Sequence, residues 1–160
     1  MTPNRGIGAR LGPRNATGDD GDLKKGVPWP DLRFTDNGDG TVTDNLTGLI
    51  WLQNANCFGI RTWFDALSDC NNLEDGNCGL SDASSKGDWR LPNRNELESL
   101  MDFEVVSLPL VPPFVNGGWK YWSSTAYGST QAWFMEANGV VDATPPAVRW
   151  SVWPVRDGKK

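Results

Sequence analysis

The chain has 160 residues, a net charge of −5 and no histidine. This length fits one domain with irregular ends. The lack of histidine excludes histidine-based triads, histidine general bases and histidine metal sites. The acidic balance, without clustered Lys or Arg, argues against nucleic acid and strongly sulfated glycans as partners. Every apolar run is too short to cross a bilayer, so no membrane insertion is expected.

Residues 1–33 are rich in Gly, Pro, Asn, Asp and basic residues, which predicts an irregular lead-in to a domain over 34–158. This lead-in contains no apolar signal-peptide segment. The domain opens with apolar positions that alternate around a Gly/Asp/Asn turn, which predicts a β-hairpin over 34–44. The apolar segment 49–52 predicts a short buried strand.

Two helices are predicted in the middle of the chain. Apolar residues recur at three- and four-residue steps over 62–74, which is typical of a helix with one buried face. The segment 75–88 consists largely of Gly, Ser, Asp and Asn and predicts a long loop. Asn93, with Glu96 three residues later, resembles a capping box and predicts the start of the second helix.

The chain after Pro113 has a β-strand pattern to its end. Asn138-Gly139 is a strong hairpin signal. Pro154 predicts an edge position or a bulge in the last strand. The order of elements predicts an α+β fold in which the first and last strands pair and a C-terminal β-meander follows the helices. The predicted strands of the C-terminal region are 121–125, 132–137, 140–143 and 148–156.

The C-terminal region also supplies the candidate ligand contacts. If Trp133 and Met135 point inward, alternation turns their neighbours in the strand outward. In the last strand, an inward Val152 places Trp150 on the same face and Arg149 on the other. Aromatic and small polar side chains make good contacts, although ordinary solvated loops explain the same residues. The candidates are Tyr127, Ser129, Gln131, Phe134, Glu136, Asn138, Asp142, Arg149 and Trp150.

Acidic residues around glycine turns form a candidate calcium site at Asp36, Asp39 and Asp44. The alternating ligand series and terminal Glu of an EF-hand are missing. Tight turns need the same residue types, so turn formation is the alternative interpretation. The long loop holds a second candidate of the same kind at Asp75, Asp82 and Asp88.

The three cysteines, Cys57, Cys70 and Cys78, lack the C-x-x-C spacing of a zinc ribbon. One disulfide and one spare thiol is the simplest interpretation, and a disulfide implies an oxidising compartment. Cys70 lies on the apolar face of the first helix, which predicts a buried free thiol.

Seven short strings lie at 34–44, 48–51, 87–92, 96–97, 121–125, 132–133 and 152–156. Their order resembles a bacterial family, the Lcl C-terminal type, which includes the C-terminal domains of collagen-like adhesins. The resemblance implies a C-type lectin-like fold, extracytoplasmic placement, ligand binding or adhesion, and no catalytic residues. The strings around Cys57 and Cys78 are similar to a subgroup in which these two cysteines pair, whereas Cys70 has no counterpart.

These features predict a secreted or surface-displayed domain that binds a glycan or a protein through its C-terminal meander, without a cofactor and without enzymatic activity. Related adhesin domains form trimers, so a homo-oligomer such as a trimer is a further possibility for this chain. One alternative is a retroelement-diversified hypervariable binding protein on the same fold. An oxidoreductase of the formylglycine-generating type fits less well, because its copper-binding cysteine pair lies late and no cysteine follows Cys78 here. A glycosidase that uses only carboxylates stays compatible with the composition.

Overall fold

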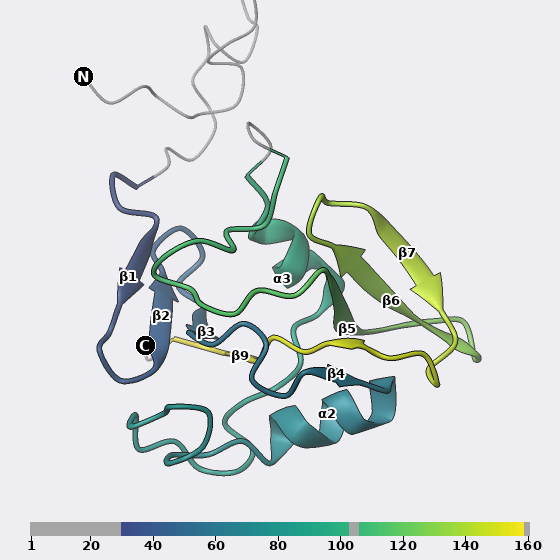
Figure 1. Cartoon of the computed structure of the whole chain (residues 1–160), viewed down its shortest axis with the longest axis horizontal. Helices are drawn as coiled ribbons and strands as arrows, with labels where there is room; N and C mark the ends of the chain where they lie inside the picture. The colour runs from purple at the N-terminus through teal and green to yellow at the C-terminus, as the bar shows by residue number, and fades with distance from the viewer. Residues whose placement is uncertain (1–29, 103–105, 159–160) are drawn as a thin grey trace, which may run out of the picture. The chain divides into compact units, whose positions relative to one another are not determined.

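The computed structural model describes residues 30–102 and 106–158. The chain divides into two units, Met1–Arg33 and Phe34–Lys160, and the second unit carries the strands and helices discussed below. The expected lead-in over 1–33 lies outside the described residues except for 30–33. The second unit is a mixed α+β structure, as predicted, with two sheets and two helices among the described residues (Figure 1). None of the helices in this described part could cross a membrane.

The first sheet joins the two ends of the domain. The predicted hairpin is present, and β2 also pairs with β3, as Val42 opposite Trp51 shows. The last strand enters this sheet antiparallel to β3, with Val155 opposite Trp51. The predicted partner of the last strand was wrong, because β1 lies at the sheet edge and β3 takes that role. In order across the sheet, the strands are β1 (Phe34–Asp36), β2 (Thr41–Asp44), β3 (Ile50–Leu52) and β9 (Val155–Arg156).

The second sheet contains the predicted meander. Three consecutive antiparallel strands, β5, β6 and β7, form it, and a bulge interrupts β5 between Trp122 and Ala126. The short strand β8 runs parallel to β5 and also pairs with β4. In order across the sheet, the strands are β4 (Ile60–Arg61), β8 (Trp150–Ser151), β5 (Lys120–Tyr127), β6 (Gln131–Glu136) and β7 (Val141–Thr144).

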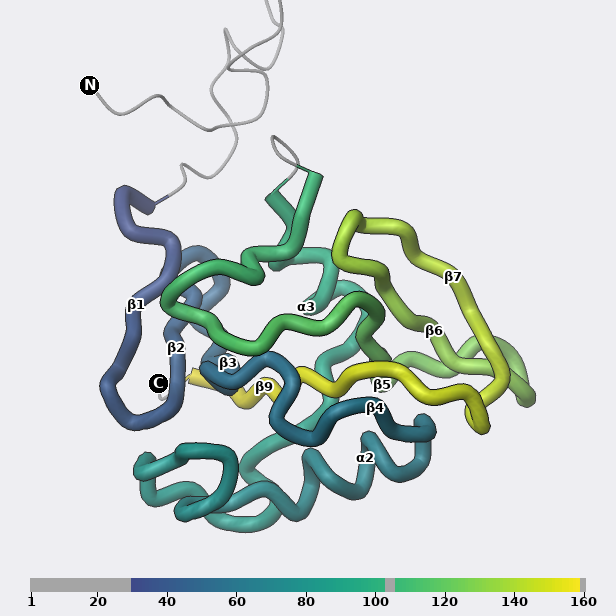
Figure 2. The backbone as a smooth tube through the Cα atoms, viewed as in Figure 1, coloured from purple at the N-terminus to yellow at the C-terminus, as the bar shows by residue number. Residues whose placement is uncertain are grey.

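The single strand predicted over 148–156 was wrong. The chain forms β8 in the second sheet, crosses through 152–154, and forms β9 in the first sheet, as the yellow tube in Figure 2 shows. Pro154 has no N–H to donate to a ladder, which favours the break at this point. The carbonyl oxygen of Pro154 instead accepts from the backbone N–H of Leu52 at 3.0 Å. The crossover therefore ties the two sheets together.

Both predicted helices are present. The first, α2 (Trp63–Asn71), begins after Thr62, whose side chain accepts from the Asp65 N–H, and it ends three residues before the predicted position 74. The second, α3 (Arg94–Ser99), has the predicted capping box, in which the Asn93 and Glu96 side chains each accept from the other's backbone N–H. The cap fixes the direction in which the chain enters α3.

The loop over 75–88 packs against the turn of the β1–β2 hairpin. Gly40 has a φ of +85°, and a Cβ at this position would collide with the carbonyl oxygen of Gly79. The Ser81 N–H donates to the Asp39 carbonyl oxygen at 2.9 Å. The close approach therefore requires glycine at position 40.

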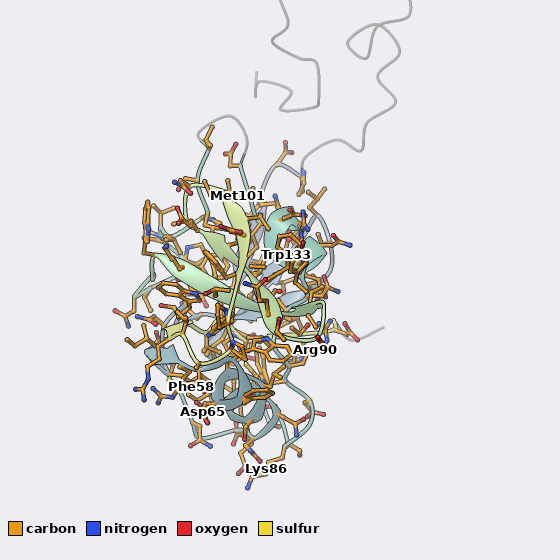
Figure 3. The ribbon with its side chains drawn as sticks, turned by 90° about the vertical axis from the view of Figure 1, so that its right-hand side faces the viewer. Phe58, Asp65, Lys86, Arg90, Met101 and Trp133 are labelled. Carbon is orange, nitrogen blue, oxygen red and sulfur yellow. A yellow bond between two sulfur atoms is a disulfide. The ribbon has the colours of Figure 1, made fainter. Side chains whose placement is uncertain are left out.

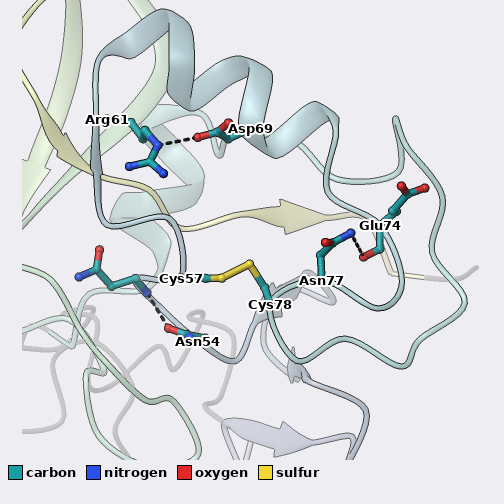
Figure 4. The surroundings of a disulfide bond; sticks show 8 residues. Asn54, Cys57, Arg61, Asp69, Glu74, Asn77 and Cys78 are labelled. Atoms are coloured by element: carbon teal, nitrogen blue, oxygen red, sulfur yellow. Dashed lines mark hydrogen bonds and ion pairs between the residues drawn. A yellow bond between two sulfur atoms is a disulfide. The ribbon is translucent and has the colours of Figure 1, made fainter.

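The predicted disulfide links the segment before α2 to this loop. Cys57 and Cys78 are bonded, with a Cα–Cα distance of 5.8 Å (Figure 4). Cys70 is a free, buried cysteine in α2, as predicted. Burial raises the pKa of the Cys70 thiol, and the nearby Asp69 charge adds to this effect. Cys70 is thus an inert part of the core.

The core consists of two hydrophobic clusters on opposite sides of the second sheet. One contains Trp51, Trp89 and Trp153, and the other packs Ala66 of α2 against the sheet. Because both faces of the sheet are covered, the residues that alternate along a strand are buried on either face. The outward direction predicted for Phe134 was wrong, since this side chain lies in the α2 cluster and is 6% exposed.

Candidate functional site

The predicted ligand residues of β6 lie on two opposite faces of the sheet. Gln131 and Trp133 point to the face covered by α3, whereas Phe134 and Glu136 point to the face covered by α2, because neighbouring residues alternate. The structure therefore divides the predicted surface into two groups that no single small ligand contacts together.

The group on the α3 side forms what we call the aromatic stack, made of Arg94, Trp133 and Tyr127. The Arg94 guanidinium lies 4.3 Å from the centre of the Trp133 ring, and the Tyr127 ring meets Trp133 edge-on at 4.9 Å. Tyr127 is 51% exposed, and Ser129 is exposed in the turn beside it. Gln131 is half-buried opposite Tyr127. The stack thus exposes the Tyr127 ring to solvent, while Trp133, which packs against Arg94, supports it.

The Arg94 backbone fixes the position of the stack. Its N–H donates to Thr125 Oγ1 at 3.0 Å, and Pro92, two residues earlier, accepts from the Ser124 N–H at 2.7 Å. These bonds attach the start of α3 to β5. Figure 3 shows Trp133 close to α3 and Arg90 nearer to α2. No local pattern indicated Arg94, because its contact with Trp133 depends on how α3 docks onto the sheet.

The group on the α2 side packs together through an ion pair and ring contacts, although the buried Trp150 indole N–H has no hydrogen-bond partner among the described residues. Lys120 Nζ lies 3.0 Å from Glu136 Oε1, 4.6 Å from the Trp150 ring centre and 5.3 Å from the Phe134 ring centre. Trp150 and Val152 pack on this same side, as predicted. Because each charge has a partner and the rings pack together, this group stabilises the sheet. Three further predicted residues, all exposed, lie in β7, in the turn after β6 and just before β8: Asp142, Asn138 and Arg149.

The calcium site predicted at Asp36, Asp39 and Asp44 was wrong. Each of the three carboxylates accepts a backbone N–H two residues further along the chain, at distances of 2.8 to 3.0 Å. Such bonds stabilise turns. Over 30–102 and 106–158, no group of three His, Cys, Asp or Glu residues is placed to hold a metal ion. The second candidate set is likewise used by the loop, through Asp75, Asp82 and Asp88.

A cleft that the sequence did not predict lies between α2 and the segment 90–93, and we call it the α2 cleft. Its volume is about 630 Å³. Phe64, which is 63% exposed, lies outside the apolar stripe of α2 and was the one available signal. Three separate chain segments line the cleft, so sequence patterns alone could not bring them together. The lining residues are Phe64, Leu67, Ser68, Asn71, Arg90, Leu91, Asn93 and Ser124.

Arg90 is held rigidly at the edge of this cleft. Its guanidinium forms a two-pronged ion pair with Glu96, at 2.5 and 2.7 Å, and a further bond to Asp157 at 2.9 Å. The hydrogen bonds to Glu96, followed by those to Asp157, raise the pKa of Arg90. Its positive charge is therefore already matched by two carboxylates.

A second cleft of about 470 Å³ lies on the other side of Arg90, against the loop over 82–88. Arg156 lines it and bonds to Asp82 at 3.2 Å, while its guanidinium lies 5.3 Å from the Trp89 ring centre. The Trp89 indole N–H donates to Ser84 Oγ at 3.0 Å. These bonds tie the loop to the C-terminal strand, whereas the buried Arg156 Nε has no hydrogen-bond partner among the described residues.

Comparison with known proteins places these features in a family. No curated protein matches the sequence. The family model of the Lcl C-terminal domain matches residues 40–156. That span contains both helices, the disulfide, the aromatic stack and the α2 cleft. The resemblance inferred from the sequence strings is confirmed at the level of the family, and the chain belongs to the Lcl C-terminal domain family.

Proposed function

We propose that this chain is a secreted or surface-displayed binding domain with a C-type lectin-like fold, which recognises a glycan or a protein through the aromatic stack. The exposed Tyr127 ring, braced by Trp133, carries this proposal. An aromatic ring that is already held in place loses little entropy on binding. Ser129 and Gln131 supply hydrogen-bonding groups beside it.

Two further features support the proposal. The Cys57–Cys78 disulfide is typical of proteins that mature in an oxidising compartment. The only free cysteine, Cys70, is buried and keeps its proton, which opposes a role as a nucleophile. Together with the lack of histidine, this favours binding over catalysis.

The test measures binding of the labelled full chain to a glycan array and to immobilised surface proteins. We expect Tyr127→Ala to weaken the binding found at least about tenfold, which corresponds to roughly 1.4 kcal/mol. Tyr127→Phe retains the ring and should keep most of the affinity. Trp119→Ala is the matched control, because Trp119 is 58% exposed just before the opposite end of β5. Equal binding by Tyr127→Ala and the unchanged chain would refute the proposed site.

A further inference from the structure

We propose that the α2 cleft is a second binding site, which takes a neutral hexose unit of a saccharide. Two cleft residues, Asn93 and Ser124, directly precede Arg94 and Thr125 in the chain, so the cleft and the aromatic stack are built on the same segments. The cleft shares no lining residue with the stack, so this inference goes beyond the proposed function. Its volume of about 630 Å³ also falls within the usual range for small-ligand sites.

The apolar part of the cleft suits the C–H face of a sugar ring. Phe64 exposes 63% of its surface at the rim, and its ring is braced by Trp63 at a centroid distance of 5.3 Å. Trp63 is itself fixed, because its indole N–H donates to the Ser123 carbonyl oxygen at 2.8 Å. Leu91 is buried and lines the cleft from the other side. The negative face of an aromatic ring attracts polarised C–H groups, which line one face of many hexoses.

The polar groups of the cleft suit hydroxyls. Within the described part of the chain, Asn71 and Ser124 bond through their backbone groups, and neither the Asn71 side chain nor the Ser124 hydroxyl makes a hydrogen bond. Asn93 uses its oxygen to accept from the Glu96 N–H at 2.8 Å, which leaves its two amide N–H groups available. An amide and a hydroxyl each offer donors and acceptors, as sugar hydroxyls require. These groups come from α2, from the cap of α3 and from β5, so they surround a ligand on several sides.

The charge of the cleft favours a neutral ligand. Of the described residues that line it, Arg90 alone is ionisable, and Glu96 and Asp157 already match its charge. An acidic sugar would find no unpaired cation there, and a basic ligand would find no unpaired carboxylate. A peptide that binds by adding a strand needs a free sheet edge, whereas one wall of this cleft is a helix whose backbone bonds are satisfied internally. A neutral saccharide therefore fits better than a peptide.

The experiment titrates the full, disulfide-bonded chain with methyl glycosides of glucose, galactose, mannose and N-acetylglucosamine, and follows backbone amide shifts by NMR. We expect at least one glycoside to shift signals of 64–71 and 90–93. Phe64→Ala and Asn71→Ala should each weaken that binding at least about tenfold. Ile60→Ala is the matched control, because Ile60 is exposed just before α2 and does not line the cleft.

Each outcome decides the inference. No shift at tens of millimolar glycoside, unchanged affinity in Phe64→Ala, or tighter binding of sialic acid or of short peptides at these residues would overturn it. Methyl glycoside binding that survives Tyr127→Ala but not Phe64→Ala supports a separate site. Array binding that is lost in Tyr127→Ala, with no glycoside bound in the cleft, would leave the proposed function standing while this inference fails.

Discussion

The buried carboxylate of Asp82 is held by several partners. Asp82 is 1% exposed, and one of its oxygens accepts from Ser84 Oγ at 2.6 Å while the other accepts from Arg156 at 3.2 Å. Ser84 in turn accepts from the Trp89 indole N–H. Removing one member of a buried ion pair leaves the other charge unmatched in a poorly solvated place. The pair therefore makes the 75–88 loop dependent on the C-terminal strand.

Arg156→Met should lower the free energy of unfolding by about 3–5 kcal/mol, because it leaves Asp82 buried and unpaired. Lys86→Met is the matched control, since Lys86 lies 3.8 Å from Glu74 and both side chains are well exposed. This surface pair should contribute less than about 1 kcal/mol. Urea unfolding followed by tryptophan fluorescence measures both values. Similar losses in the two variants would contradict the account.

Tyr121 should make stability depend on alkaline pH. Burial raises its pKa to about 12, and the Gly118 N–H, which donates to the phenol oxygen, opposes part of that rise. The phenol of the unfolded chain ionises near pH ~10. The contribution of Tyr121 to the free energy of unfolding is therefore complete below pH ~10. It is lost at about 1.4 kcal/mol per pH unit as the pH rises towards the pKa of the folded state.

The measurement compares urea unfolding of Tyr121→Phe and the unchanged chain across this pH range. Phenylalanine does not ionise, so the variant should lose less stability with rising pH than the unchanged chain. Tyr127→Phe is the control for an exposed tyrosine. Parallel pH profiles for Tyr121→Phe and the unchanged chain would show that Tyr121 is not the group responsible.

At the scale of elements, patterns complete within a few residues were predictable. The capping box of Asn93 and Glu96 contains both of its bonding groups, and the hairpin over 34–44 contains its own turn. Features that depend on distant segments were not. The outward direction predicted for Phe134 was wrong, because the alternation rule assumes that one face of the sheet is exposed to solvent, whereas α2 covers that face. The prediction of a single strand over 148–156 was wrong, because a local pattern cannot show that the chain passes from one sheet to the other.

The candidate site shows the same limit. Tyr127 and Ser129 were predicted as contact residues because turn residues beside a strand are recognisable locally, and both are exposed in the structure. Arg94 was missed because its contact with Trp133 joins α3 to β6, two segments that lie far apart in the chain. The α2 cleft was missed because an exposed aromatic such as Phe64 acquires its neighbours only when α2 docks. Sequence patterns therefore located part of one surface but not the contacts that hold it.

The disulfide sets the stability of the β4–α2 region. Cys57 and Cys78 are separated by 21 residues, and the loop between them includes β4 and all of α2. Closing a loop of this length restricts the unfolded chain and stabilises the fold by about 3 kcal/mol in a chain-entropy model. The double variant Cys57→Ala/Cys78→Ala should lose that amount in urea unfolding. The unchanged chain with reductant should match the variant, and a loss below about 1 kcal/mol would contradict the assignment.

At the scale of the whole domain, the crossover between the sheets closes the core. The Trp153 ring packs against Trp51 at 5.4 Å, Phe114 at 4.9 Å and Tyr121 at 5.3 Å, so it touches segments from both sheets. Its indole N–H donates to the Leu52 carbonyl oxygen at 2.9 Å. The first sheet and the meander are therefore joined by residues close to the end of the domain.

A chain that ends at Ser151 should not fold cooperatively, because it lacks both β9 and the buried Trp153 ring. Replacing a buried tryptophan with alanine typically costs about 3–5 kcal/mol, and here a strand of the first sheet is lost as well. The near-UV circular dichroism of the shortened chain should be weak. A peptide of residues 152–158 should restore the signal, since it supplies both missing parts. The same peptide with Trp153→Ala should not, because the strand alone leaves the space between the sheets empty. A sharp unfolding transition in the shortened chain without peptide would show that the core closes without the crossover.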